Sequence, residues 1–423
     1  METILKYGKK EISIAIPDRN IRGILGPQGA EPLTDLEKEA SQLLDEPSAG
    51  PSLAEIIEEM EPRKVAIIVN DLTRSTPTPP ILKPVLEKLL ARGLAKEQIS
   101  IVIATGTHRP MTEDEMISVT GEEVFREYCV VNHDCDSPDL VTMGILSGDN
   151  ELTINRTVAE ADLRIAIGEV LLHYYAGFAG GRKSIFPGVA GRETIMRNHR
   201  MMTFPGVGIG KTSGNPVSEQ MVEAIKKYCP LHFIVNCISN SHKQVVKMVA
   251  GDAVKAWEKG IEIFKKMNFS PVDKQADVVF VSAGGFPKDI NMYQAHKALE
   301  MCCAAVREGG SIVFFAELIE GYGHTIFQEW AKRKMDPAEA VRTFENNFRF
   351  GAHKIFYLAK LAQKCDIYLY SSMSAEESEE MYCKKINSID EVLPLLINKY
   401  GEDFTAWVIP QGGIVLPVLD AKG

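Results

Sequence analysis

The sequence has no apolar run of about 18 residues, the length that a membrane-spanning helix needs. It also has no segment rich in lysine and arginine, and 47 basic against 57 acidic residues leave a net charge of −10. These two absences argue against a membrane protein and against nucleic acid as a partner. The start of the chain lacks the apolar block of a secretory signal peptide, so we expect a cytoplasmic protein.

Paired cysteines are missing as well. Eight cysteines are scattered between Cys129 and Cys383, and no two of them have CxxC spacing. This pattern excludes a zinc ribbon and a dithiol redox motif. In a chain of 423 residues we expect reduced, mostly packed thiols. The composition, with 45% hydrophobic and 25% charged residues, is that of an ordinary globular protein long enough for two domains.

Short runs of β-branched residues alternate with helical stretches along the whole chain. Runs at 64–70, 99–106, 161–170 and 231–239 are continuously apolar, which is typical of parallel strands covered on both faces. A second series of such runs follows at 276–285, 311–318 and 366–373. We therefore predict an α/β protein with two α/β domains and mainly parallel sheets.

The polar, proline-containing segment 269–275 is the best candidate for a linker. It predicts an N-terminal α/β domain over residues 1–268 and a C-terminal α/β domain over 269–394. Residues 406–418 read as a hairpin or strand pair. The segment 395–423 could return to the first domain or complete the second.

Polar, titratable residues follow several predicted strands at the point where each ends. Since ligands of open α/β sheets lie beyond the carboxyl ends of the strands, these residues predict a site. They are Asp71, Thr73 and Arg74 after the first strand, His108 and Arg109 after the second, His173 after the third, and residues 284–294 after the first strand of the second series.

The segment from Leu171 to Arg200 is the densest in candidate residues. Its glycines, which include Gly180, Gly181 and Gly188, permit close backbone approaches. Arg182, Lys183 and Ser184 place two cations and a hydroxyl in this turn, which suits a phosphate group. A kinase or nucleotidase that uses this loop is therefore one alternative. The P-loop spacing fails, however, because Arg182 intrudes before the lysine and Pro187 interrupts the helix that should follow.

Histidine is scarce, with nine residues, yet His108, His173 and His199 all lie in or beside these loops. A neutral histidine binds borderline metals and exchanges protons near neutral pH. We assign ordinary structural roles to most of the other six. A protein that only carries nickel or a nucleotide is a further alternative.

Several candidates have plain structural explanations beside the functional ones. Asp71 and Thr73 could form an Asx turn, whereas the guanidinium fork of Arg74 suits a carboxylate or phosphate. Arg109 could be an ion-pair partner. In the segment from Gly284 to Lys297, Tyr293 and Lys297 share one helix face, so Lys297 either points toward a site or is simply solvated.

Together these four segments resemble the nickel-dependent lactate racemase family. The resemblance rests on the turn from Asp71 to Pro77, the turn Gly106-Thr-His-Arg-Pro, the stretch from His173 to His199, and the segment from Gly284 to Lys297. It implies a two-domain α/β enzyme with the active site in the interdomain cleft. It also implies a nickel-pincer nucleotide as cofactor, bound by the N-terminal domain, and thus proteins that make or deliver it.

The resemblance also assigns roles to individual residues. Lys183 would carry the cofactor, His199 would be the ligand to nickel, and His108 and His173 would be the two acid/base catalysts. Asp71, Thr73, Arg74, Gly180, Gly181, Arg182, Ser184, Pro187 and Gly188 would bind the cofactor. Arg74, Tyr293, Gln294 and Lys297 would bind the substrate.

The chemistry implied is racemisation or epimerisation of a 2-hydroxy acid. Removing the α-proton of such an acid would build a dianion, whereas moving hydride to the cofactor, while a histidine takes the hydroxyl proton, gives a keto acid. Three departures from the family pattern concern the substrate wall. Leu72 replaces a histidine, Ser75 replaces a proline, and no tryptophan lies near His353 in the sequence. They predict a substrate larger or more polar than lactate.

Overall fold

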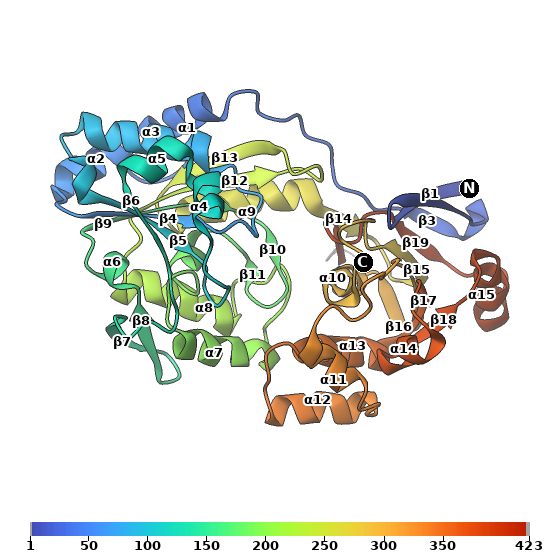
Figure 1. Ribbon diagram of the computed structural model, residues 1–423. Coiled ribbons are helices and arrows are strands. Elements are labelled where there is room, and N and C mark those ends of the chain that lie inside the picture. The colour runs from blue at the N-terminus through green and yellow to red at the C-terminus, as the bar shows by residue number, and fades with distance from the viewer. Residues whose placement is uncertain (1, 420–423) are drawn as a thin grey trace. The chain divides into compact units, whose positions relative to one another are not determined.

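The computed structural model describes residues 2–419, and these fold into two compact units (Figure 1). One unit, here the central unit, is continuous and covers residues 29–266. The other, the terminal unit, combines the residues up to 28 with those from 267 onward. Both units have an α/β architecture, as the alternating pattern predicts.

The predicted domain boundaries differ from these units at both ends of the chain. The first 28 residues were expected in the N-terminal domain, but strand β3 (Ile21–Ile24) pairs in parallel with β19 (Ala406–Ile409) of the terminal unit. The same pairing places residues beyond 395 in the terminal unit, so they do not return to the first domain. Strand partners far apart in sequence cannot be read from local patterns, which explains the difference.

The central unit is built on a six-stranded sheet in which only the edge strand β13 is antiparallel. Its strand order is β13 (Val245–Gly251), β12 (Phe233–Ser239), β9 (Leu163–Glu169), β4 (Val65–Asn70), β5 (Ile99–Ala104) and β6 (Cys129–Asn132). Two small antiparallel pairs accompany it, β7 (Val141–Leu146) with β8 (Asn150–Ile154) and β10 (Leu172–His173) with β11 (Gly177–Phe178).

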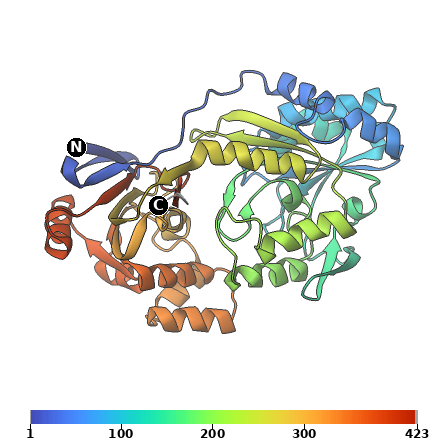
Figure 2. The same ribbon diagram turned by 180° about the vertical axis from the view of Figure 1, so that it is seen from behind.

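Helices cover both faces of this sheet, which is why its central strands are largely apolar. On one face Val65, Ile67 and Val69 of β4 pack with α1, α2 and α3, while Ala66 and Ile68 are buried on the other. Figure 2 shows the molecule from behind, with α9 beside β12 and β13. The helices are α1 (Leu36–Asp45), α2 (Leu53–Met60), α3 (Thr78–Ala91), α4 (Glu113–Thr120), α5 (Glu122–Glu127), α6 (Arg156–Ala159), α7 (Arg192–Arg200), α8 (Pro216–Glu223) and α9 (Lys255–Asn268).

The terminal unit has a six-stranded sheet that is parallel throughout. Its order is β18 (Cys383–Ile386), β17 (Asp366–Tyr370), β16 (Val306–Phe315), β15 (Ala276–Ser282), β19 and β3. Strands β1 (Glu2–Tyr7) and β2 (Lys10–Ala15) form a hairpin beside it. The helices are α10 (Met292–Cys302), α11 (Thr325–Ala331), α12 (Pro337–Asn346), α13 (His353–Lys364), α14 (Ala375–Glu380) and α15 (Val392–Tyr400).

Two local predictions in this unit are wrong. The expected linker contains strand β14 (Phe269–Val272), and the expected C-terminal hairpin does not form. Strand β20 (Leu416–Leu419) pairs in parallel with β14, whereas β19 joins the main sheet. A parallel pair between β14 and β20 tolerates Pro271 because this two-stranded sheet leaves each strand with a free edge. Across residues 2–419, no helix is both long and apolar enough to cross a membrane.

Candidate active site in the central unit

The candidate residues of the central unit follow the carboxyl ends of three adjacent strands. Strand β4 lies between β5 and β9, and the chain runs outward from β4 in both directions. Such a switch point opens a crevice at the strand ends. Asp71 follows β4, His108 follows β5, and His173 follows β9. A backbone bond from Gly106 N to Gly188 O, 3.0 Å long, ties the β5 loop to the glycine-rich segment.

Asp71 and His108 form a hydrogen-bonded pair. The distance from Asp71 Oδ2 to His108 Nδ1 is 2.6 Å, and Asp71 is buried while His108 is exposed. Asp71 Oδ1 also accepts hydrogen bonds from Thr73 N and Thr73 Oγ1. Burial favours a raised pKa for Asp71, but the bonds from His108 and Thr73 outweigh it and leave the pKa below its ordinary value. An ionised Asp71 therefore fixes the ring of His108.

The same turn presents Thr73 and Arg74 at the surface. Both side chains are exposed, and Arg74 N donates to Asp71 O, so the predicted Asx turn is present. The positive charge of Arg74 helps to lower the pKa of Asp71, His173 and Lys183, so its guanidinium lies near all three. Arg74 thus brings a positive charge to the strand ends, as its predicted role requires.

His173 lies in the small β10–β11 pair and is half-buried. Ala176 N donates to its Nδ1 at 3.3 Å, and its ring stacks on Tyr174 and meets Tyr175 edge-on. Burial, followed by the charges of Lys183 and Arg74, lowers the pKa of His173 well below its ordinary value. The ring is therefore neutral near neutral pH, the state that a proton acceptor needs.

Lys183 lies in the short 3₁₀ turn from Gly181 to Ser184 and is half-buried. Its Nζ is 5.8 Å from the ring centre of Tyr175. Burial, with the charges of Arg74 and Arg182, lowers the pKa of Lys183 well below its ordinary value. A lysine with a lowered pKa loses its proton more readily than an ordinary lysine, and the unprotonated amine is the form that makes a covalent link.

The glycines of this turn are required by close packing. A side chain at Gly180, where φ is +82°, would approach Asn236 Oδ1 to 2.7 Å, and one at Gly188 would approach Ser184 O to 2.3 Å. Gly181 N donates to Asn236 Oδ1, Ser184 is buried, and Pro187 follows a cis peptide bond. These residues shape the turn that holds Lys183, so any contact of theirs with a cofactor remains a prediction.

Arg182 does not have the role that its sequence position suggests. It is fully buried, and its guanidinium donates to the carbonyls of Phe178 and Ala176 and to Ser218 Oγ. The guanidinium also stacks on Trp257 at 3.8 Å from the ring centre. Because its guanidinium donates to groups in the protein interior, Arg182 stabilises the turn and does not point these donors at a phosphate.

His199 lies in the last turn of α7 and is buried. Its Nε2 lies 2.6 Å from Tyr175 Oη. Burial and the charge of Lys183 lower the pKa of His199 to about 3. This neutral imidazole beside Lys183 is a suitable metal ligand. His173, Lys183 and His199 are thus brought together, as predicted.

Sequence reasoning missed three polar residues of this region. Tyr175 contacts His173, Lys183 and His199. Glu169, at the end of β9, is buried with a raised pKa because of burial, and Asn236 of β12 anchors the glycine turn. The position of Glu169 at a strand end, and the presence of the polar Asn236 inside an otherwise apolar strand, were the signals that could have found them. Tyr175 offered no such signal, because aromatic residues are common in buried turns.

Tyr293, Gln294 and Lys297, predicted to bind substrate, lie together at the start of α10 in the terminal unit. Gln294 and Lys297 are exposed, and Lys297 Nζ donates to Gln294 Oε1 at 2.9 Å. Tyr293 is half-buried, and its ring stacks on His324 with centres 4.8 Å apart. Their contact with a substrate stays a prediction.

A buried charged group, not anticipated from the sequence, lies beneath Tyr293. Lys354 Nζ is 3.1 Å from His296 Nδ1 and 5.0 Å from the ring centre of Tyr293. His296 Nε2 lies 3.5 Å from Glu300 Oε2. His353 also meets the Tyr293 ring edge-on. The histidines assigned ordinary roles in this segment are therefore packed around a candidate binding residue.

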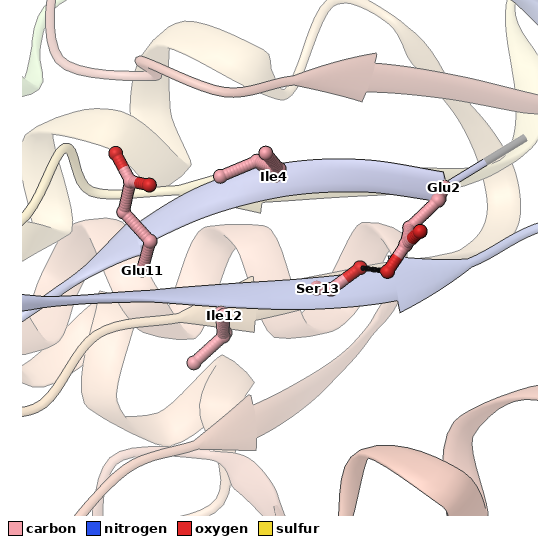
Figure 3. A pocket seen from close by; sticks show the side chains of 5 residues that line it. All are labelled: Glu2, Ile4, Glu11, Ile12 and Ser13. Atoms are coloured by element: carbon pink, nitrogen blue, oxygen red, sulfur yellow. Dashed lines mark hydrogen bonds between the residues drawn. The ribbon is translucent and has the colours of Figure 1, made fainter.

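The structure confirms the ion-pair alternative for Arg109 and excludes a P-loop at Lys183. Arg109 makes a two-pronged ion pair with Glu115, so it is a structural partner on the surface. The lysine turn does not begin a helix, since α7 starts only at Arg192, and this is not the strand–loop–helix arrangement of a P-loop. A surface hollow on the β1–β2 hairpin, lined by Glu2, Ile4, Glu11, Ile12 and Ser13, contains none of the predicted residues (Figure 3).

Comparison with known proteins shows the family of this chain. The family model of the lactate racemase N-terminal domain matches residues 7–210, and that of the lactate racemase C-terminal domain matches residues 272–416. A lactate racemase of Thermoanaerobacterium thermosaccharolyticum is 30% identical over 422 residues, covering 97% of this chain and 98% of the relative. This chain belongs to the lactate racemase family.

A second lactate racemase and two solved structures are similar to this chain over more than nine-tenths of its length. A lactate racemase of Lactiplantibacillus plantarum is 29% identical, covering 97% of this chain and 99% of the relative. The solved structure of the lactate racemase apoprotein from T. thermosaccharolyticum superposes with a TM-score of 0.90 at 29% identity, over 99% of this chain and all of that one. A Thermotoga maritima protein with a TM-score of 0.61 and 20% identity shares the fold over 93% of this chain and all of that one.

Proposed function

We propose that this chain is an isomerase that racemises or epimerises a 2-hydroxy acid. Two curated relatives of nearly equal length are lactate racemases, and both domain models of that family match this chain. The observation that carries the proposal is the grouping of His173, Lys183 and His199 around Tyr175. A purely structural loop has no need of a lysine and two histidines with lowered pKa values in one place.

The residues present fit a nickel-pincer nucleotide. The neutral ring of His199 is a ligand that nickel accepts, and the amine of Lys183, once unprotonated, would condense with a thiocarboxylic group to a thioamide with loss of water. Arg74 adds a positive charge that suits the anionic parts of a nucleotide. Lys183 would hold the cofactor covalently and His199 would ligate its metal.

When bound, this cofactor supplies an electrophilic carbon that accepts hydride from C2 of the substrate. The chain's own task is to move the hydroxyl proton. Asp71 holds Nδ1 of His108, which leaves Nε2 of that exposed ring to take a proton. His173 is neutral and offers a second base, as inversion requires. Arg74 is placed to hold the substrate carboxylate.

The test is chiral product analysis of the cofactor-loaded protein. We expect each enantiomer of a 2-hydroxy acid to be converted to the other, with loss of this conversion in His108→Ala and His173→Ala. A loaded protein that binds the cofactor but inverts none of lactate, malate, 2-hydroxyglutarate, phenyllactate and sugar acids would be a carrier, and the proposal would fail.

We also propose that the preferred substrate is larger or more polar than lactate. Leu72, an exposed side chain, and Ser75 flank Arg74, while the three tryptophans are used elsewhere. Trp257 packs on Arg182, Trp330 on Phe344, and Trp407 on Arg22. A pocket discriminates one methylene by only about 1–3 kcal/mol, so some activity on lactate is expected. Lactate ranking first in kcat/KM would contradict this.

The same proposal implies partners and a compartment. The cofactor must be made and delivered by other proteins, since this chain carries only its attachment site. All eight cysteines are free thiols, which supports a reducing cytoplasmic environment. Co-expression with and without cofactor-making enzymes tests the first point, because only the former should give an adduct on Lys183.

A further inference from the structure

Tyr175 lies at the centre of the candidate site, yet it has no role in the predictions above. It is in the turn between β10 and β11 and is 4% exposed. Its ring centre lies 4.4 Å from that of His173, 4.8 Å from that of His199 and 5.8 Å from Lys183 Nζ. It therefore touches a predicted base, the predicted metal ligand and the predicted cofactor lysine.

The hydroxyl of Tyr175 is directed at one atom in particular. Tyr175 Oη lies 2.6 Å from His199 Nε2, a short hydrogen bond. A phenol is a better donor than acceptor, so the hydroxyl donates and Nε2 presents its lone pair. A metal needs the same lone pair, because only an unprotonated imidazole nitrogen is a ligand.

The surroundings keep Tyr175 in this position. Asn215 Nδ2 donates to its backbone carbonyl at 2.7 Å, and its ring meets that of Tyr174 edge-on at 4.7 Å. The His199 ring packs on Tyr175, and Lys183 Nζ lies 5.8 Å from the centre of the same Tyr175 ring, so the nitrogen that Tyr175 holds belongs to the group around the predicted cofactor lysine.

We propose that Tyr175 holds the metal-binding nitrogen of His199 in the unloaded protein and releases it to nickel when the cofactor is bound. This rests on the proposed function, in which His199 is the nickel ligand. The exchange breaks the hydrogen bond from Oη to Nε2 and forms a bond from the Nε2 lone pair to nickel, while the proton stays on the phenol oxygen. Tyr175 is thus a positioning residue that selects the ligating tautomer before metal arrives and competes with the metal afterwards.

The first measurement uses the unloaded protein and histidine-selective ¹⁵N NMR. We expect Nε2 of His199 to be the unprotonated nitrogen, with the signal assigned by comparison with His199→Ala. Tyr175→Phe should shift the His199 signals, and Tyr174→Phe, which removes the neighbouring hydroxyl, should leave them in place. A protonated Nε2 in the wild type, or His199 signals unchanged in Tyr175→Phe, would overturn the proposal.

The second measurement uses the loaded protein challenged with excess EDTA. Nickel loss is followed by elemental analysis and by the absorption of the cofactor. Without a competing hydroxyl, Tyr175→Phe should lose nickel about two- to tenfold more slowly than wild type, the range that one net hydrogen bond supplies. Tyr174→Phe should match the wild type. Equal or faster loss from Tyr175→Phe would refute the competition.

The two measurements separate this proposal from the proposed function. If the wild type takes up no nickel and no adduct, the proposed function fails, and the release of His199 to nickel fails with it. If the wild type binds cofactor and nickel, and Tyr175→Phe and Tyr174→Phe behave alike in both measurements, the proposed role of Tyr175 is wrong and the proposed function is unaffected. Thermal unfolding of each variant, expected within a few degrees of wild type, checks that the fold is intact.

Discussion

Lys183 in the central unit is half-buried and Lys354 in the terminal unit is buried, and the two lysines differ in the charge of their neighbours. Lys183 lies near Arg74 and Arg182, and these cations add to the effect of burial in lowering its pKa. Burial also lowers the pKa of Lys354, but the carboxyl of Glu300 opposes that shift, while burial raises the pKa of Glu300 in turn.

The comparison teaches what a buried lysine is suited for. A lysine among cations loses its proton more readily, because no carboxylate offsets the cost of keeping its charge, and the unprotonated amine is a nucleophile. A lysine linked to a glutamate through a histidine is held by electrostatic attraction, which suits a structural or positioning role. Lys354 lies against the ring of Tyr293, whereas the surroundings of Lys183 suit the covalent bond proposed for it.

The largest expected effect is complete loss of the adduct in Lys183→Ala. After co-expression with cofactor-making enzymes, intact mass should show the adduct on the wild type and none on this variant. Lys354→Ala should keep the adduct, and so should Lys211→Ala, a change at an exposed lysine of the same unit. An adduct that persists in Lys183→Ala would show that Lys183 is not the attachment site, and the proposed difference between the two lysines would be wrong.

The next effect separates the histidines near Lys183. His199→Ala should lose bound nickel, because a metal ligand is removed, while His108→Ala and His173→Ala should retain it and lose turnover by about 10²–10⁴-fold. Elemental analysis and rate measurements on the same preparations decide this. Stoichiometric nickel in all three variants would show that the roles are divided wrongly.

The third prediction tests the structural role of the other lysine. Glu300→Gln removes the partner of a buried charge, and we expect a loss of about 3–5 kcal/mol in the free energy of unfolding of the terminal unit. Denaturant titration followed by tryptophan fluorescence measures it, since Trp330 and Trp407 lie in that unit. Glu308→Gln, an exposed site, is the control. A negligible loss would mean that Glu300 and Lys354 are both neutral.

The smallest effect concerns pH. Because the pKa of Lys183 is lowered, its amine is already unprotonated at pH values where an ordinary lysine, with a pKa of about 10.4, is charged. In the unloaded protein, acylation of Lys183 should thus rise less steeply between pH 8 and 10 than acylation of the exposed Lys211. Pulse labelling with peptide mass spectrometry measures both. A parallel rise would contradict the lowered pKa.

The sequence alone predicts most of the local elements, and several of its candidate residues are brought together by the fold. Continuous apolar runs identify β4, β5, β9 and β12, because a parallel strand covered on both faces carries mostly apolar residues on both sides. The residues after these strands then converge for topological reasons, which is why Asp71 and His108 were found as candidates, although their direct pairing was not.

The features that the sequence did not predict depend on contacts between residues far apart in the chain. Arg182 has the residue type of a phosphate ligand, and only the positions of Ser218 and Trp257 turn it into a buried support. The group formed by His296, Glu300 and Lys354 joins two helices more than fifty residues apart. Likewise, β3 finds its partner almost four hundred residues later in the chain.

This last pairing has a consequence for biosynthesis. The central unit is a single uninterrupted stretch of chain, so it can fold as soon as residue 266 has left the ribosome. The terminal unit cannot complete its sheet until β19 has been made, so β3 must wait for its only sheet partner among the described residues until more than 380 further residues have been translated. The part that carries Lys183 is therefore ready first, and the edge strand β3 is exposed to non-productive pairing in the interval.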